Sequence, residues 1–284
     1  MISGTRYRLS VEINRQTALA GEIADLQAQI STGKRLQAPS DDPAAAAQIA
    51  QLARAQANEG AWKSNLDSAA ALADRADTAL QSVADRLDRA VELVVSARSA
   101  TLSAENRATI ASELNGIADE LATLADSPDP RGHPLFRSGT ALAIPVHAGG
   151  TIAPVASRET VFGNVATAAG TSDIIAIVRG AASAATEPDA TRETDLSAAI
   201  DAVNAAAAHI AAARGNQGVT AHRIEQLQEG LAQSGLQLNE QRAGLESTDL
   251  VEAIAKLQSR QLSLQAAQSV FAHVNQSTLF DLLR

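Results

Sequence analysis

The sequence predicts a mainly α-helical protein, in which long antiparallel helices from both chain ends form a coiled coil or bundle with a small β-rich middle insertion. Three observations lead to this fold class. Apolar residues recur at steps of three and four over most of the chain. Hydrophobic residues make up 45% of the 284 residues and aromatic residues only 2%, with alanine the commonest apolar residue. The periodicity is lost between residues 132 and 170, where Gly, Pro, Thr and Val increase.

Residues 1–42 are predicted to form a first helix and a connecting segment. Apolar and small side chains step by four and three along the helix, with glutamines among them, at Leu9, Ile13, Gln16, Ala20, Ile23, Gln27 and Ile30. Polar residues in such a heptad seam can simply set the register of a coiled coil. Alternatively, this end stays loose until neighbouring subunits bury it, because so short a helix is marginal alone in water.

The connecting segment reads STGKRLQAPSDDP and runs from residue 31 to residue 43. Gly33 ends the first helix, and Pro39 and Pro43 change the direction of the chain. Asp42 is a good N-cap, Pro43 suits the first helical position, and both Asp41 and Asp42 oppose the positive end of the next helix. These aspartates therefore indicate helix capping in preference to an acid–base pair.

Residues 43–130 are predicted as the N-terminal half of an inner helical domain. A long helix runs from Pro43 to about Arg98, and Ser103 caps a third helix, which ends at the sequence SPDPRG, residues 127–132. Residues 131–190 form the small β-rich middle region, with short strands expected at 141–147 and 158–162.

A helix returns near Ser172 and is interrupted by a polar break at 186–193. Residues 191–245 are the C-terminal half of the inner helical domain, with a kink expected near Gly215 and Gly218. Residues 246–284 form the last helix, which Asp249 caps, with Glu252 three residues later. Its apolar face is expected at Leu250, Ile254, Leu257, Leu264, Phe271 and Leu282. Because its seam also contains glutamines, like that of the first helix, we expect the two chain ends to lie side by side.

Several functional classes find no support in the sequence. The net charge is −9 with no basic stripe, which argues against a nucleic-acid partner. The chain has no cysteine, and no two of its five histidines are three or four residues apart, so no metal site is predicted. No phosphate-binding, dinucleotide-binding or nucleophile motif is present, and we expect no enzymatic activity and no cofactor. No stretch looks apolar enough for membrane insertion, and the N-terminus lacks the apolar core of a cleaved signal peptide.

Three segments resemble bacterial flagellin-family axial proteins: residues 31–52, STGKRLQAPSDDPAAAAQIAQL; residues 127–139, SPDPRGHPLFRSG; and residues 247–283, which end in STLFDLL. In that family the terminal helices pair into an inner tube around an export channel. The resemblance implies that the segment with Gly33, Pro39, Asp41, Asp42 and Pro43 is a spoke between two layers of helices. It also implies an assembly interface at Leu9, Ile13, Ile23, Ile30, Leu250, Ile254, Leu257, Leu264, Phe271 and Leu282.

Within the family, the sequence PSDDP at 39–43 and the STLFDLL ending resemble the members that join the flagellar hook to the filament. The implied function is therefore a structural axial subunit at that junction, exported to the extracellular flagellum. The implied partners are copies of itself, another hook-associated protein, flagellin and an export chaperone. Flagellin, the filament-forming subunit, is the first alternative, and a soluble coiled-coil adaptor is the second.

Overall fold

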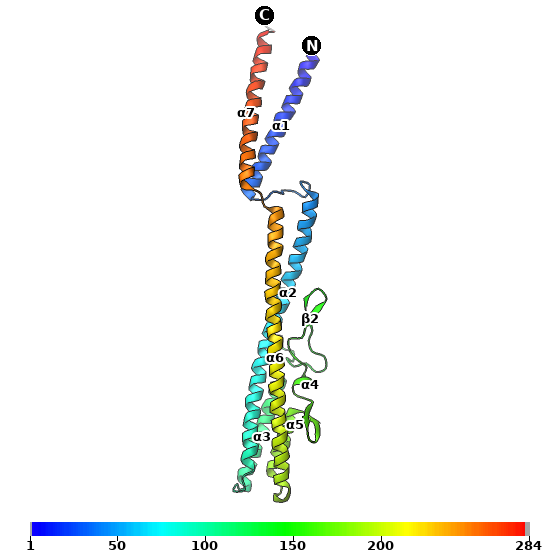
Figure 1. Ribbon diagram of the computed structural model, residues 1–284, viewed down its shortest axis with the longest axis vertical. Helices are drawn as coiled ribbons and strands as arrows, with labels where there is room; N and C mark the ends of the chain where they lie inside the picture. The colour runs from blue at the N-terminus through cyan, green and yellow to red at the C-terminus, as the bar shows by residue number, and fades with distance from the viewer. Residues whose placement is uncertain (1, 282–284) are drawn as a thin grey trace. The chain divides into compact units, whose positions relative to one another are not determined.

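The structure is a computed structural model that describes the backbone of residues 2–281 and the side chains of residues 7, 10–188 and 191–273. Figure 1 shows the course of the chain, which divides into two compact units by its internal contacts. One unit is built from both chain ends, up to residue 57 and from residue 234 onward, and the other from residues 58–233. Both boundaries fall inside helices, so the sequence gives no loop or linker that would mark them.

The predicted fold class is confirmed, because long helices dominate and two small two-stranded sheets lie in the middle of the chain. The helices are α1 (Ile2–Thr32), α2 (Pro43–Ala97), α3 (Ala104–Ala125), α4 (Arg158–Val161), α5 (Ile174–Thr186), α6 (Asp189–Glu246) and α7 (Leu250–Asp281). The strands are β1 (Ile144–His147), β2 (Gly150–Ile152), β3 (Val165–Thr167) and β4 (Gly170–Ser172). Each sheet is an antiparallel hairpin, with β1 paired to β2 and β3 paired to β4.

The helix caps predicted at Asp42, Ser103 and Asp249 are confirmed, whereas the Asp41 carboxylate accepts from the N–H groups of Gln37 and Ala38 and does not cap α2. The Asp42 carboxylate accepts a hydrogen bond from the backbone N–H of Ala45 at 3.0 Å, and α2 begins at Pro43. The Ser103 hydroxyl accepts from Asn106 N–H at the start of α3. At the start of α7 the Asp249 carboxylate accepts from the N–H groups of Val251 and Glu252 at 2.9 and 3.1 Å. These side chains satisfy backbone donors that the first turn of each helix leaves without partners.

The core of the second unit lies between α2, α3, α5, α6 and the loop that follows α3. Its largest fully buried side chains include Phe136 and Phe162, whose ring centroids lie 5.1 Å apart in an edge-to-face arrangement. Helical spacing brings the other members onto one face of each helix, at positions such as Leu80, Val83, Leu87, Leu114, Leu121, Val203 and Ile210. A smaller core joins Val146 and Ile152 of the β1–β2 hairpin to Leu66, Ala69, Ala73 and Ile224.

Two expectations about this region are wrong. Residues 158–161 form α4, not a strand, because Ser157 caps the segment by accepting from Thr160 N–H. The polar break at 186–193 is much shorter than expected, since α5 ends at Thr186 and α6 begins at Asp189. Helix α6 is uninterrupted through Gly215 and Gly218.

The expectation that no stretch is apolar enough to cross a membrane also needs correction. Helix α6, over Thr191–Glu246, could do so by length and composition alone. Alanines dominate residues 198–213 of this helix, and they make it apolar without adding large side chains. Leu196, Val203 and Ile210 of the same stretch are fully buried in the core of the second unit, and the core helix of a soluble protein also passes such a test.

Candidate assembly surface

Helices α1 and α7 pack side by side, as the sequence predicts (Figure 1). Each helix has a half-buried stripe at steps of three, four or seven: Gln16, Leu19, Ile23, Leu26 and Ile30 on α1, and Leu257, Leu264, Ala267 and Phe271 on α7, with Ala253 fully buried. An exposed ion pair of Arg260 and Glu22, 2.9 Å apart, joins the two helices beside these stripes. We call this contact the covered seam.

The predicted interface residues separate into two groups. Ile23, Ile30, Leu257, Leu264 and Phe271 are half-buried in the covered seam. Ile13, Leu250 and Ile254 are instead 49%, 47% and 44% exposed. The side chain of Leu9 and the whole of Leu282 lie outside the described residues.

The predicted interface left out part of the covered seam and part of the exposed apolar surface. Leu19 and Leu26 flank the predicted positions and lie in the covered seam. Val251 and Leu262 are 80% and 68% exposed, although both are large and apolar. A helical wheel of α7 would have indicated these positions, because they share one side of the helix with Ile254.

That side of α7 carries no carboxylate, Lys or Arg between residues 250 and 273. Glu252, Lys256 and Arg260 lie on the other side of the helix at 100° per residue. The uncharged side combines exposed apolar groups with glutamines: Leu250, Val251, Ile254, Gln258, Gln261, Leu262, Gln265 and Gln268. Helix α1 has an equivalent side, with Ile13, Thr17, Ala20, Ala24 and Gln27. We call these two surfaces the uncharged stripes, and each lies next to the covered seam.

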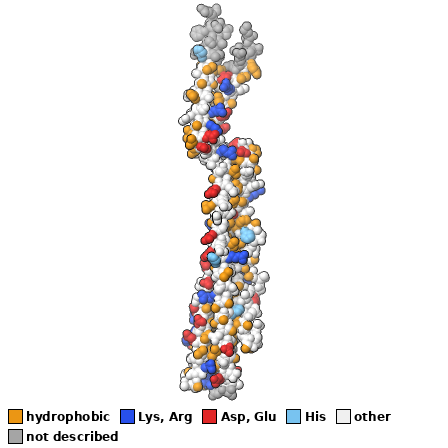
Figure 2. Space-filling model, viewed as in Figure 1, with side chains coloured by type: hydrophobic (Ala, Val, Ile, Leu, Met, Phe, Trp, Pro, Cys, Tyr) orange, Lys and Arg blue, Asp and Glu red, His pale blue; other side chains and the backbone are white. Residues whose placement is uncertain are grey.

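Two short connectors, residues 33–42 and 247–249, join these terminal helices to α2 and α6. Gly33 begins the first connector with φ +67°, a left-handed conformation that glycine adopts without strain. The Asp41 carboxylate accepts from the N–H groups of Gln37 and Ala38 at 2.9 and 2.8 Å, and so fixes the turn that contains Pro39. The hydrogen bond from Ala45 N–H is the main cause that lowers the pKa of Asp42, with a smaller contribution from Arg35. Acidic and basic side chains gather where these connectors lie in Figure 2.

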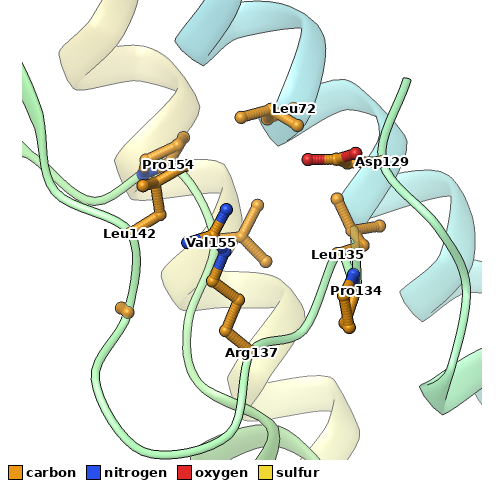
Figure 3. A pocket seen from close by; sticks show the side chains of 9 residues that line it. Leu72, Asp129, Pro134, Leu135, Arg137, Leu142, Pro154 and Val155 are labelled. Atoms are coloured by element: carbon orange, nitrogen blue, oxygen red, sulfur yellow. The ribbon is translucent and has the colours of Figure 1, made fainter. Parts of the chain in front are cut away.

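In the part of the chain that the structure describes, the cavities give no indication of a catalytic or metal-binding site. The cavity in Figure 3, lined by Leu72, Asp129 and Arg137 among others, has a volume of about 10 Å³, which holds roughly one water molecule. Burial raises the pKa of Asp129, but backbone N–H groups of His133 and Arg131 donate to its carboxylate, and the net pKa is lowered. Asp129 therefore stabilises its own loop as a carboxylate. Among the described residues, no group of three or more His, Asp or Glu could hold a metal ion.

Comparison with known proteins places the chain in a family. The model of the bacterial flagellin N-terminal helical region matches residues 11–140, and that of the bacterial flagellin C-terminal helical region matches residues 200–283. The chain belongs to the bacterial flagellin family. The two matches include most of α1, all of α2 and α3, most of α6 and all of α7, and therefore both connectors and the greater part of both terminal helices.

Individual relatives refine this assignment. The flagellar hook-associated protein 3 of Escherichia coli K12 is 26% identical over 287 residues, which cover 89% of this chain and 90% of that protein. The flagellar hook-associated protein 3 of Salmonella typhimurium is 35% identical over 135 residues, and this match spans less than half of that relative, 43%. The structure of flagellar hook-associated protein 3 from Legionella pneumophila, at 12% identity and a TM-score of 0.63, covers 69% of this chain and 98% of its own. At that identity it shows a shared fold.

Proposed function

We propose that this chain is a structural axial subunit of the bacterial flagellum that joins the hook to the filament by helical packing of its terminal helices. The observation that carries this function is the pair of uncharged stripes, which expose large apolar side chains such as Val251 and Leu262 beside a seam that is already covered. Contiguous exposed apolar surface indicates a binding surface. The two hook-associated relatives support the junction over the alternative of a filament-forming flagellin.

The same stripes argue against a soluble coiled-coil adaptor. A coiled-coil pair needs one seam per helix, and α1 and α7 already provide it to each other. A second apolar side on each helix is accounted for when copies of the chain pack side by side.

The partners that follow are further copies of the chain, another hook-associated protein on the hook side, flagellin on the filament side and a chaperone during export. The chain would act outside the cell in the flagellum, with no nucleic-acid partner. Its role would be structural, with no catalytic activity and no cofactor.

Charge substitutions on the two sides of α7 test this function. The change Ile254→Asp would put a charge into the buried interface between copies, at a cost of several kcal/mol. We expect it to leave the helix content and the exported amount unchanged but to abolish motility in a strain that lacks the natural gene. Flagellin would then leak unpolymerised into the medium.

The matched control is Ser259→Asp, which adds the same charge at an exposed position near Glu252 and Lys256. We expect Ser259→Asp to restore motility fully. Equal motility with both variants would show that the uncharged stripe of α7 faces solvent, and the proposed function would be wrong.

A further inference from the structure

The two connectors are hydrogen-bonded to each other through the backbone. Arg35 N–H donates to the Glu246 carbonyl at 2.7 Å, and Thr248 N–H donates to the Gly33 carbonyl at 3.0 Å. Lys34 and Ser247 are antiparallel bridge partners between these bonds. The connectors therefore form a short two-stranded tie, although more than 200 residues separate them in the sequence.

Glu246, the last residue of α6, is at the centre of the charged groups around this tie. Its Oε1 atom accepts from Arg242 Nε at 2.6 Å, and its Oε2 atom lies 3.7 Å from the ammonium nitrogen of Lys34 on the other connector. Its side chain is only 20% exposed. One carboxylate thus contacts a cation of its own helix and a cation of the opposite connector.

Arg242 extends these contacts to α2. Its Nη1 atom donates to Gln56 Oε1 at 3.1 Å, and the Gln56 amide donates to Asn239 Oδ1 at 2.7 Å. On the other side, Arg35 reaches the Leu245 carbonyl and the Asp42 carboxylate at 3.3 and 3.4 Å. A continuous polar network therefore joins the ends of α2 and α6 to both connectors.

We propose that Glu246 is the positioning residue of this joint: its carboxylate, held between Arg242 and Lys34, locks the two connectors together so that α1 and α7 leave the joint as one pair. The backbone bonds alone could form with any side chain at position 246. Without the carboxylate, however, Arg242 and Lys34 would repel each other, and the side-chain contact left between the first connector and α6 would be the long hydrogen bond from Arg35 to the Leu245 carbonyl, 3.3 Å. The joint would keep this property whether or not the chain lies between hook and filament.

The test measures hydrogen exchange of the Arg35 and Thr248 backbone amides in the full chain, because these two amides form the tie. The change Glu246→Gln keeps the shape and removes the charge. We expect it to increase exchange at both connectors about tenfold, as for one lost charged hydrogen bond, while exchange within α3 and α5 stays unchanged. The triple variant Lys34→Glu, Arg242→Glu, Glu246→Lys exchanges the charges and should restore slow exchange.

The control Glu22→Gln breaks the exposed ion pair with Arg260 between the same two helices and should leave the connectors as they are. Wild-type exchange in Glu246→Gln would overturn the proposal. So would a uniform increase over the whole chain, which would indicate a general stability effect, or failure of the triple variant to restore slow exchange.

Acid provides a second measurement on the same variants. The hydrogen bond from Arg242 lowers the pKa of Glu246, burial opposes it, and the charges of Arg242 and Lys34 add to the lowering. The Glu246 carboxylate therefore stabilises the joint fully at pH values above the ordinary pKa of a glutamate. This stabilisation is lost as the pH falls through the lowered pKa of Glu246. Asp42 also titrates on this network, through Arg35, but only the Glu246 contribution disappears in Glu246→Gln. The wild type should lose connector protection at acid pH and converge on that variant, whereas a constant difference would contradict the proposal.

Discussion

Gln217 shows how one buried polar side chain can join three segments of the chain. It lies on α6 among apolar neighbours and is only 5% exposed. Its amide nitrogen donates to the backbone carbonyls of Pro154 at 2.8 Å and Ala73 at 3.3 Å. The first carbonyl belongs to the segment that follows the β1–β2 hairpin and the second to α2, so Gln217 connects the middle region to the two long helices.

The change Gln217→Ala should destabilise the second unit by about 1–3 kcal/mol, because it leaves the Pro154 carbonyl without its donor in a buried place. Urea unfolding of the full chain measures this difference. The control is Gln228→Ala on the same helix, which loses only an exposed hydrogen bond to Asp67 and should cost much less. If the two variants were equally stable, the buried hydrogen bonds of Gln217 would contribute no more to the free energy of unfolding than the exposed hydrogen bond of Gln228.

Among the elements, the helices and their caps could be predicted from the sequence because both depend on local patterns. Asp42, Ser103 and Asp249 each cap the helix that the spacing indicates. The short strands and α4 could not be predicted to the residue; the β1–β2 hairpin, for example, is held by Val146 and Ile152 against distant helices.

The covered seam could be predicted only in part, for a related reason. The predicted stripe on α1 contained both Ile23, which packs against α7, and Ile13, which does not. Apolar residues occur on two adjacent sides of each terminal helix, and only the position of the partner helix decides which side is covered. No pattern in the sequence predicts the tie between the connectors, because the tie consists of backbone hydrogen bonds and of charged side chains that are far apart in the sequence.

At the start of α7, Asp249→Ala should cost about 1 kcal/mol and increase hydrogen exchange in the first turn, because two N–H groups lose their acceptor. Asp249→Asn keeps an acceptor oxygen and should behave nearly as the wild type. Hydrogen exchange of residues 250–254 measures the effect. Equal exchange in both variants would mean that the cap contributes nothing to the helix.

At the scale of the whole molecule, the two family matches cover most of α1, all of α7 and both connectors, and the region between them, 141–199, contains both hairpins, α4 and α5. The parts that carry the proposed assembly are thus the parts that the family shares. The middle region packs on α2 and α6 through its own core, and it is the part for which the sequence resemblance gave no detail. Assembly and the compact core of the second unit therefore depend on different residues.

The most direct test of the central claim is the position of this chain in isolated hook–filament segments, determined by cryo-electron microscopy. The proposed function predicts a short layer of this chain between the end of the hook and the first flagellin subunits, with the uncharged stripes of α1 and α7 buried between neighbouring copies. Finding the chain repeated along the filament as its bulk subunit would contradict the junction role and support the flagellin alternative.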